Sequence, residues 1–255
     1  DIMIPRHDLI NKVDFLLSFN PVVALLGPRQ CGKTTLARMY SEKQPLFEYF
    51  DLEDPADINR LSVSMMALEP LRGLIILDEV QRKPEIFERI RVLADRTPNP
   101  SKFLLLGSAS PHLVKGVSES LAGRVAFIEM SGFNIREAGD PNFRSLWLRG
   151  GFPRSFLAES DEKSVIWRKN FIQTYLERDI PQLGISIPAL TLRRFWTMIA
   201  HYHGQIWNAA ELARSMGSSE STMRRYLDLL CGTFVVRQLA PWYENIGKRQ
   251  VKSPK

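Results

Sequence analysis

The chain has 255 residues, of which 44% are hydrophobic and 24% charged, a composition typical of a globular protein rather than a disordered or fibrous one. No apolar run approaches the roughly 20 residues that a membrane-spanning helix needs, and no secretion signal is present, so we expect no membrane and a cytoplasmic location. The net charge of +6 is uneven: residues 1–140 hold 17 basic and 19 acidic side chains, a net of −2, while residues 141–255 hold 17 and 9, a net of +8.

The first part of the chain alternates helices and strands. A helix is expected from about Pro5 to Phe19, and the apolar run 21–26 predicts a buried strand that ends in a glycine turn. Further strands are expected at 46–52, 73–79, 102–108 and 124–130, with helices at 33–42, 54–68, 83–96 and 110–123. Because this alternation is typical of a parallel sheet covered on both faces, the predicted fold class is α/β.

The stretch GPRQCGKTT, residues 27–35, fits the phosphate-loop pattern G-x-x-x-x-G-K-[ST] between a strand and a helix. We expect Gly27 to permit the tight turn and Gly32 a close backbone approach. Lys33 places an ammonium on the β/γ-phosphates, Thr34 is a natural Mg²⁺ ligand, and the helix directs its positive end at the anion. The expected nucleotide-binding residues are Gly27, Pro28, Arg29, Gln30, Cys31, Gly32, Lys33, Thr34, Thr35 and Asp78.

An acidic pair closes the strand at 73–79. The run LIILDE places Asp78 and Glu79 after four apolar residues. We expect Asp78 to reach Mg²⁺ through water and Glu79 to orient and polarise the attacking water. The alternative is an acidic pair that merely closes a strand, and the phosphate loop upstream favours the catalytic interpretation.

Two more residues are candidates for contact with the phosphates. Ser108 ends the strand at 102–108, and in a parallel sheet that end lies beside the phosphates. It is a candidate γ-phosphate sensor, with a helix cap as the alternative. Arg124, in SLAGR, is a candidate arginine finger for this subunit or a neighbour, with a surface ion pair as the alternative. For the two cysteines, Cys31 and Cys231, we favour two buried thiols over a disulfide.

After Ser131 the pattern changes. Residues 132–160 are rich in Gly, Pro, Phe and Arg and are expected to be irregular. Helices are expected at 161–180, ended by Pro181, and at 188–204, stopped by Gly204. The predicted domains are a P-loop domain at 1–131, a helical connecting region at 132–188 and a basic C-terminal part at 189–255.

The basic C-terminal part follows the order of a winged helix-turn-helix. Asn208 caps a short helix that Gly217 ends, a second helix follows at 218–230, and TFVVRQL, residues 233–239, predicts a strand. The residues expected to point inward from the second helix are Met223, Tyr226, Leu227 and Leu230. Those expected to point outward, as candidate DNA contacts, are Ser218, Ser219, Glu220, Thr222, Arg224 and Arg225. A docking or lid module inside an ATPase is the alternative to DNA binding, as is a merely soluble basic surface.

An ordered set of motifs covers nearly the whole chain. The motifs are GPRQCGKTTLA, YFDLEDP, LIILDEVQ, LLLGSAS, SLAGR, GGFP, TYLERDI, MRRYLDLL and NIGKRQVKSPK. In this order they resemble the prokaryotic AAA-type ATPases of the archaeal-ATPase-like group that carry an uncharacterised C-terminal domain. The resemblance implies ATP rather than GTP, a C-terminal winged helix, and a nuclease-like segment after KSPK. Lys33, Thr34, Asp78 and Glu79 match its nucleotide-contacting positions, and Ser108 and Arg124 also match.

These observations lead to one expected function and two alternatives. The expected function is an ATP-binding, Mg²⁺-dependent ATPase of the AAA type that couples hydrolysis to a partner, with DNA and self-association as candidates. The first alternative is a nucleotide-gated DNA-binding regulator with little turnover. The second, a docking protein with a purely structural P-loop, is disfavoured by Glu79. Because residue 1 is Asp and the last stretch lacks a closing element, both ends are expected to be truncations.

Overall fold

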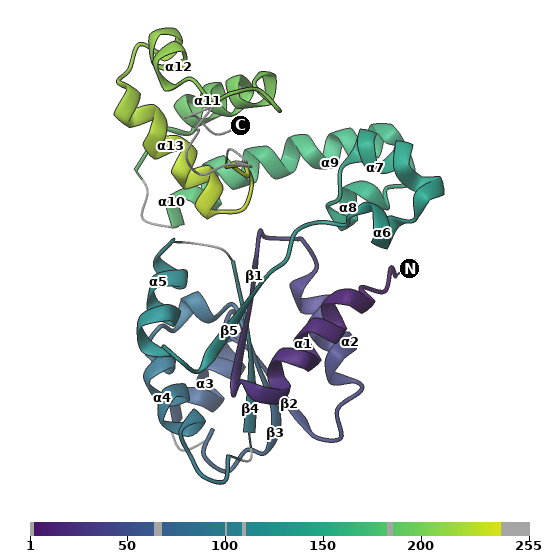
Figure 1. The fold of residues 1–255 in the computed structure, drawn as a ribbon, viewed down its shortest axis with the longest axis vertical. Helices are drawn as coiled ribbons and strands as arrows, with labels where there is room; N and C mark the ends of the chain where they lie inside the picture. Colours follow the sequence, from purple (N-terminus) through teal and green to yellow (C-terminus); the bar gives the residue numbers. More distant parts are fainter. Residues whose placement is uncertain (1–2, 64–67, 100, 109–110, 183–185, 241–255) are drawn as a thin grey trace, which may run out of the picture. The chain divides into compact units, whose positions relative to one another are not determined.

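A computed structural model describes residues 3–63, 68–99, 101–108, 111–182 and 186–240 of the chain (Figure 1). The chain divides into two compact units, Asp1–Val165 and Ile166–Lys255, and the boundary falls inside helix α9, Asp161–Thr174. Within the described ranges, no helix is both long and apolar enough to cross a bilayer.

The first unit is built on a five-stranded parallel sheet with the order β2-β3-β4-β1-β5. The strands are β1 (Val22–Gly27), β2 (Phe47–Asp51), β3 (Gly73–Asp78), β4 (Ser101–Ser108) and β5 (Val125–Glu129). Each strand begins and ends within one residue of its predicted bounds, which confirms the α/β prediction. The strands could be predicted because those buried on both faces form continuous apolar runs.

Helices cover both faces of this sheet (Figure 1). On one face lie α1 (His7–Phe19) and α2 (Lys33–Ser41), and α4 (Ile86–Ala94) and α5 (Pro111–Ser120) lie on the other. Helix α3 (Pro55–Val63) follows β2, and the predicted continuation of α3 through residues 64–67 lies outside the described residues. Val13 and Leu36 pack with Val23 and Leu25 of β1 in a core that excludes water from the sheet. Burying each such side chain contributes about 1.5–3 kcal/mol, so the interior strand β1, between β4 and β5, is held firmly in place.

Residues 132–160 are more regular than predicted. They form three short helices, α6 (Ile135–Ala138), α7 (Phe143–Arg149) and α8 (Pro153–Phe156), and a 3₁₀ turn, η2 (Asp140–Asn142). The prediction of an irregular segment was therefore wrong. Each helix has seven residues or fewer, which is too short for a helical period to be visible in the sequence. Local caps stabilise such short helices instead, as the Asn134–Glu137 capping box does for α6.

The second unit is helical. Its elements after α9 are a π-helical turn η3 (Tyr175–Asp179), α10 (Ile180–Gln182), α11 (Ala189–His201), α12 (Ala209–Met216) and α13 (Glu220–Gly232). Pro181 was expected to end the long helix but lies inside α10, which corrects that prediction. The backbone N–H of Ile180 bonds to the carbonyl of Tyr175, five residues back, and this wider turn relieves the clash that a proline makes with the carbonyl four residues before it.

The helix-turn-helix is present, but the predicted wing strand is not. Asn208 caps α12 by accepting from the N–H groups of Ala210 and Glu211, and Ser219 caps α13 by accepting from Thr222. Residues 233–240 contain no strand. The N–H groups of Val235 and Val236 instead bond to the Leu230 carbonyl at the end of α13, at 3.0 and 3.3 Å. A strand requires a neighbouring strand, and the described part of this unit offers none, so the prediction of a strand at 233–239 was wrong.

Candidate nucleotide site

The phosphate loop joins β1 to α2, and its two fixed glycines are required for reasons opposite to those expected. A Cβ on Gly27 would lie 2.1 Å from the Met130 carbonyl oxygen, so this glycine permits a close backbone approach. Gly32 has a φ of 98° and a Cβ there would meet only ordinary contacts, so this glycine permits a left-handed turn. The loop thus lies at the carboxyl end of β1, with a close approach at its first fixed glycine and a left-handed turn at its second.

Lys33 points into the loop rather than into solvent. It is 5% exposed, and its ammonium donates to the carbonyl oxygens of Gly27 at 3.0 Å and Pro28 at 2.9 Å. Lys33 is also the first residue of α2, where the helix presents unpaired N–H groups and the positive end of its dipole. A buried ammonium and a helix N-terminus at one loop form a site suited to phosphate oxygens.

Asp78, at the end of β3, lies directly beside Thr34. The Thr34 hydroxyl donates to Asp78 Oδ2 at 2.7 Å, and the Tyr49 hydroxyl from β2 donates to the same oxygen at 2.6 Å. The other oxygen, Oδ1, accepts from the backbone N–H of Glu79 at 2.9 Å. Asp78 is 3% exposed and therefore has a fixed orientation toward Thr34. Burial, followed by the contact with Asp78, raises the pKa of the Tyr49 phenol, so Tyr49 remains a donor.

Glu79 follows in a left-handed conformation with a φ of 55°. Its carboxylate oxygen Oε2 accepts from the Gln81 side-chain amide and, at 3.5 Å, from the Ser108 hydroxyl. Burial raises the pKa of Glu79, while the Gln81 hydrogen bond and the Lys33 charge oppose that rise. The structure therefore brings together Glu79 and Ser108, two residues that the sequence assigned to separate roles at the phosphates, and adds Gln81.

The remaining loop residues have varied surroundings. Arg29 donates to Glu53 at 3.0 Å, and Gln30 adopts a φ of 62°. Two of the three described non-glycine residues with positive φ, Gln30 and Glu79, are thus in this site, where backbone strain often concentrates. The Cys31 thiol is buried, which raises its pKa, and neither Cys31 nor Cys231 is in a disulfide. Pro28 is buried and Thr35 is exposed.

The sequence interpretation missed Tyr49, Gln81 and Arg6. Arg6 is 5% exposed, pairs with Glu137 at 2.7 Å and donates to the Cys31 carbonyl at 3.3 Å, so it joins the start of α1 to the phosphate loop. A buried arginine next to a helix start leaves no periodic signal. The YFDLEDP motif contains Tyr49 and the LIILDEVQ motif contains Gln81, but neither motif indicates a side-chain direction.

Arg124 lies away from this site. It precedes β5, and its carbonyl accepts from the N–H of Val22, the first residue of β1, so it is at the amino edge of the sheet. Its guanidinium pairs with Asp95 at 2.5 and 2.7 Å. The structure does not bring Arg124 to the phosphate loop of its own chain, and of the roles considered for it the ion pair is the one observed.

In the second unit, the predicted faces of α13 are confirmed. Met223, Tyr226, Leu227 and Leu230 are buried, while Arg224 and Arg225 are exposed. Arg224 lies 3.5 Å from Glu220 in an exposed ion pair, and the Arg225 guanidinium lies 5.9 Å from the centre of the Tyr226 ring.

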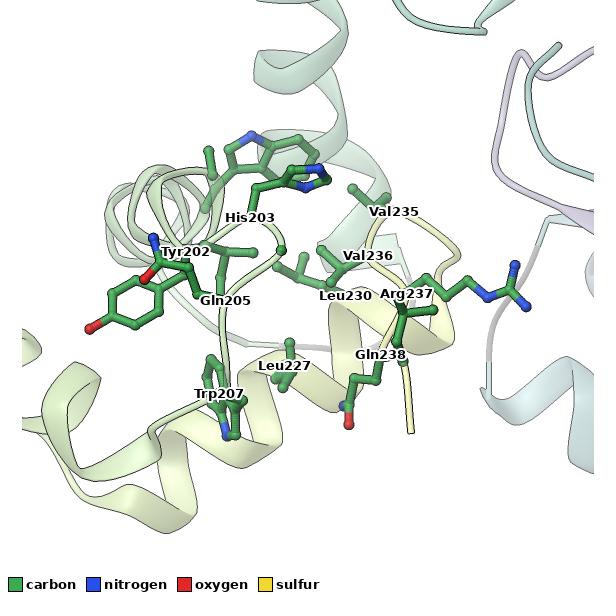
Figure 2. Close-up of a pocket in the computed structure, with 15 residues that line it drawn as sticks. Tyr202, His203, Gln205, Trp207, Leu227, Leu230, Val235, Val236, Arg237 and Gln238 are labelled. Atoms are coloured by element: carbon green, nitrogen blue, oxygen red, sulfur yellow. The ribbon is translucent and has the colours of Figure 1, made fainter. Parts of the chain in front are cut away.

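A pocket of about 480 Å³ lies between α11, α13 and residues 235–239 of this unit (Figure 2). Trp196, Trp207, Leu227 and Val236 are among its lining residues, so its walls are largely apolar and aromatic. The Arg237 side chain extends away from them in Figure 2. The segment predicted as a wing strand therefore forms one wall of an apolar pocket instead.

The fold and the site together define the class: the chain is a P-loop NTPase. Residues 19–139 match the AAA domain family, and residues 140–255 match a domain of unknown function, DUF8612. An AAA-domain match followed by a match to this C-terminal domain confirms the family resemblance noted from the motifs.

Two mycobacterial proteins are similar to this chain over its whole length. They are the Uncharacterized protein Rv2008c of Mycobacterium tuberculosis and the Uncharacterized protein Mb2031c of Mycobacterium bovis, each 54% identical over 254 residues. The chain spans 57% of their length. Among solved structures, the Walker-type ATPase paby2304 of Pyrococcus abyssi is similar in fold, with a TM-score of 0.57, 15% identity and coverage of 91% of this chain and 90% of that one.

Proposed function

We propose that the chain is a Mg²⁺-dependent ATPase of the AAA type that couples ATP hydrolysis to a partner. The observation that carries the proposal is the arrangement of Lys33, Thr34, Asp78 and Glu79 beyond the carboxyl ends of β1 and β3, the two strands that flank β4. The AAA-domain match and the fold shared with a Walker-type ATPase support nucleotide binding.

The residues present fit a magnesium ion. Mg²⁺ prefers oxygen ligands, and the Thr34 hydroxyl and Asp78 carboxylate lie 2.7 Å apart at the loop. Thr34 would hold the ion directly and Asp78 through water. The ion would neutralise charge on the β- and γ-phosphates. In this proposal Lys33 binds the phosphates, Glu79 takes up the proton of the attacking water, and Ser108 is placed to contact the γ-phosphate.

A steady-state assay tests the proposal. The purified chain is incubated with ATP or GTP, with and without Mg²⁺, and phosphate release is measured with and without duplex DNA. Mg²⁺-dependent release from ATP supports the ATPase. Nucleotide binding without turnover, together with nucleotide-dependent DNA binding, supports the second candidate instead, a nucleotide-gated DNA-binding regulator.

DNA is the candidate partner that the second unit favours. The basic half of the chain contains a helix-turn-helix whose second helix, α13, exposes Arg224 and Arg225. Self-association is the other candidate. Because Arg124 does not reach the phosphate loop of its own chain, it could act as an arginine finger only on a neighbouring subunit. The two mycobacterial relatives are longer than this chain, and both candidate partners are proposed for the part of the protein that this chain covers.

We expect the change of both Arg224 and Arg225 to Ala to weaken duplex binding and to flatten its salt dependence. Each lost phosphate contact lowers the slope of log K against log salt by about 1. Fluorescence anisotropy at several salt concentrations measures the slope. The matched control changes Arg193 and Arg194, an exposed pair on α11, to Ala. Equal slopes in a well-folded variant and its parent would leave α13 as a docking or lid element.

Tyr49→Phe tests the proposed metal site. Removing the hydroxyl leaves Asp78 Oδ2 with one donor fewer, so we expect the Mg²⁺ concentration for half-maximal turnover to rise several-fold. A hydrogen bond to a charged group contributes about 1.5–3 kcal/mol, so stability should also fall. Tyr40→Phe is the control, because the Tyr40 hydroxyl donates to Asp14 at 3.1 Å in the same way, away from the loop. If both variants shift the Mg²⁺ dependence equally, Tyr49 has no specific role there.

A further inference from the structure

The turn after β3 holds the Glu79 carboxylate by the side-chain amide of Gln81. Gln81 lies in the 3₁₀ turn η1 (Val80–Arg82), two residues after Glu79, and its Nε2 donates to Glu79 Oε2. The Ser108 hydroxyl reaches the same oxygen only at 3.5 Å, the outer limit of a hydrogen bond. Gln81 is therefore the principal donor to this carboxylate.

The carboxylate also determines which way the Gln81 amide faces. An ionised carboxylate only accepts hydrogen bonds, so the NH₂ group of Gln81 must face Glu79 and its oxygen must face the protein interior. That oxygen, Oε1, is buried and has no hydrogen-bond partner among the described residues. It packs against β4, where a Cβ on Gly107 would lie 3.2 Å from it. Such an acceptor destabilises the folded chain, at a cost that an apolar side chain in this position would avoid.

Both donors meet one oxygen of Glu79. Among the described residues, neither Gln81 nor Ser108 nor any other group donates to Oε1 of Glu79. The left-handed backbone of Glu79 and the turn that follows it bring the Gln81 amide back onto the side chain. The carboxylate is thus oriented with one oxygen held and the other available to accept a proton.

We propose that Gln81 is a positioning residue for Glu79: its amide fixes the rotation of the carboxylate so that the second oxygen faces the water that attacks the γ-phosphate. This inference rests on the proposed ATPase function. It deepens that function because it names the group that orients the base. Gln81 itself touches neither nucleotide nor metal in this assignment.

The test uses Gln81→Leu, which keeps approximate size but removes both the donor and the buried acceptor. We expect kcat to fall roughly tenfold or more, with the affinity for a fluorescent ATP analogue unchanged within about twofold, because a charge-assisted hydrogen bond is lost only at the base. The melting temperature should be equal to or above that of the parent, since the unpartnered oxygen is gone. Gln173→Leu is the control, because Gln173 also donates to a glutamate, Glu177, at 3.2 Å.

A double variant separates positioning from a general structural role. In the Glu79→Gln background, Gln81→Leu should have no further effect on kcat, because the two residues act as one unit. Full additivity overturns the proposal, as does a parent-like kcat in Gln81→Leu or a loss of affinity as large as the loss of rate.

A structural readout keeps the test independent of turnover. If the parent binds ATP without hydrolysing it, the proposed ATPase function fails, and crystal structures of parent and Gln81→Leu with a non-hydrolysable ATP analogue decide the positioning role. We expect the Glu79 carboxylate to stay at Ser108 in the parent and to rotate away in the variant. The same carboxylate position in both structures overturns the proposal.

Discussion

Lys33→Ala is expected to weaken ATP binding by roughly 10²- to 10³-fold, which corresponds to about 3–4 kcal/mol. The ammonium of Lys33 is buried inside the loop and donates only to the carbonyls of Gly27 and Pro28 in the described structure. Phosphate oxygens can replace those carbonyls as acceptors, and the exchange gains a contact between opposite charges in a site largely shielded from water. Titration with a fluorescent ATP analogue measures the loss.

Two controls make the Lys33 result interpretable. Lys43→Ala removes the same side chain at an exposed position just after α2 and should leave the affinity unchanged. Thermal melting shows whether the variant folds, since Lys33→Ala also leaves the carbonyls of Gly27 and Pro28 without their donor. A folded Lys33→Ala variant with parental affinity would contradict the phosphate-loop assignment.

Glu79→Gln is expected to retain ATP binding and to lower turnover by roughly 10²-fold or more, the loss typical of removing a general base. The substitution keeps the shape of the side chain and removes the charge that polarises water. The amide of Gln81 loses its carboxylate partner, so the variant also weakens the orientation of residue 79. Single-turnover phosphate release at saturating ATP and Mg²⁺ measures the chemical step.

The matched control for this prediction is Glu85→Gln, at an exposed position just before α4, which should hydrolyse ATP at the parental rate. Asp78→Asn should behave differently from Glu79→Gln. It weakens the acceptor for Thr34 and Tyr49, and its main effect should be a higher Mg²⁺ requirement. If Glu79→Gln turns over like the parent, Glu79 is not the base.

The local parts of the site could be predicted from the sequence. The phosphate loop is determined within a few consecutive residues, since a strand, two glycines and a helix start are all that its backbone needs. The buried strands β1, β3 and β4 are continuous apolar runs because both of their faces are covered. The caps at Asn208 and Ser219 also act within three residues of themselves.

Contacts between distant residues were decided by the tertiary structure alone. Tyr49 meets Asp78 because β2 pairs with β3, and a sequence without strand order cannot supply that pairing. The parallel pairing of β5 with β1 places Arg124, just before β5, at the amino edge of the sheet, opposite the loop, although its motif suggested a phosphate contact. The prediction of a wing strand failed for a related reason. Residues with high β-propensity, such as Val235 and Val236, form a strand only where another strand offers its backbone.

The sequence by itself thus determined the α/β class, the strands and the glycine-containing loop between β1 and α2, because these depend on local periodicity and on backbone constraints at single residues. The tertiary structure decided how Glu79 is held. Its left-handed turn, the return of the Gln81 amide and the approach of Ser108 from β4 depend on how two strands and one turn pack together. Side-chain direction at such a junction is set by packing against neighbours that are remote in sequence, so no local pattern records it.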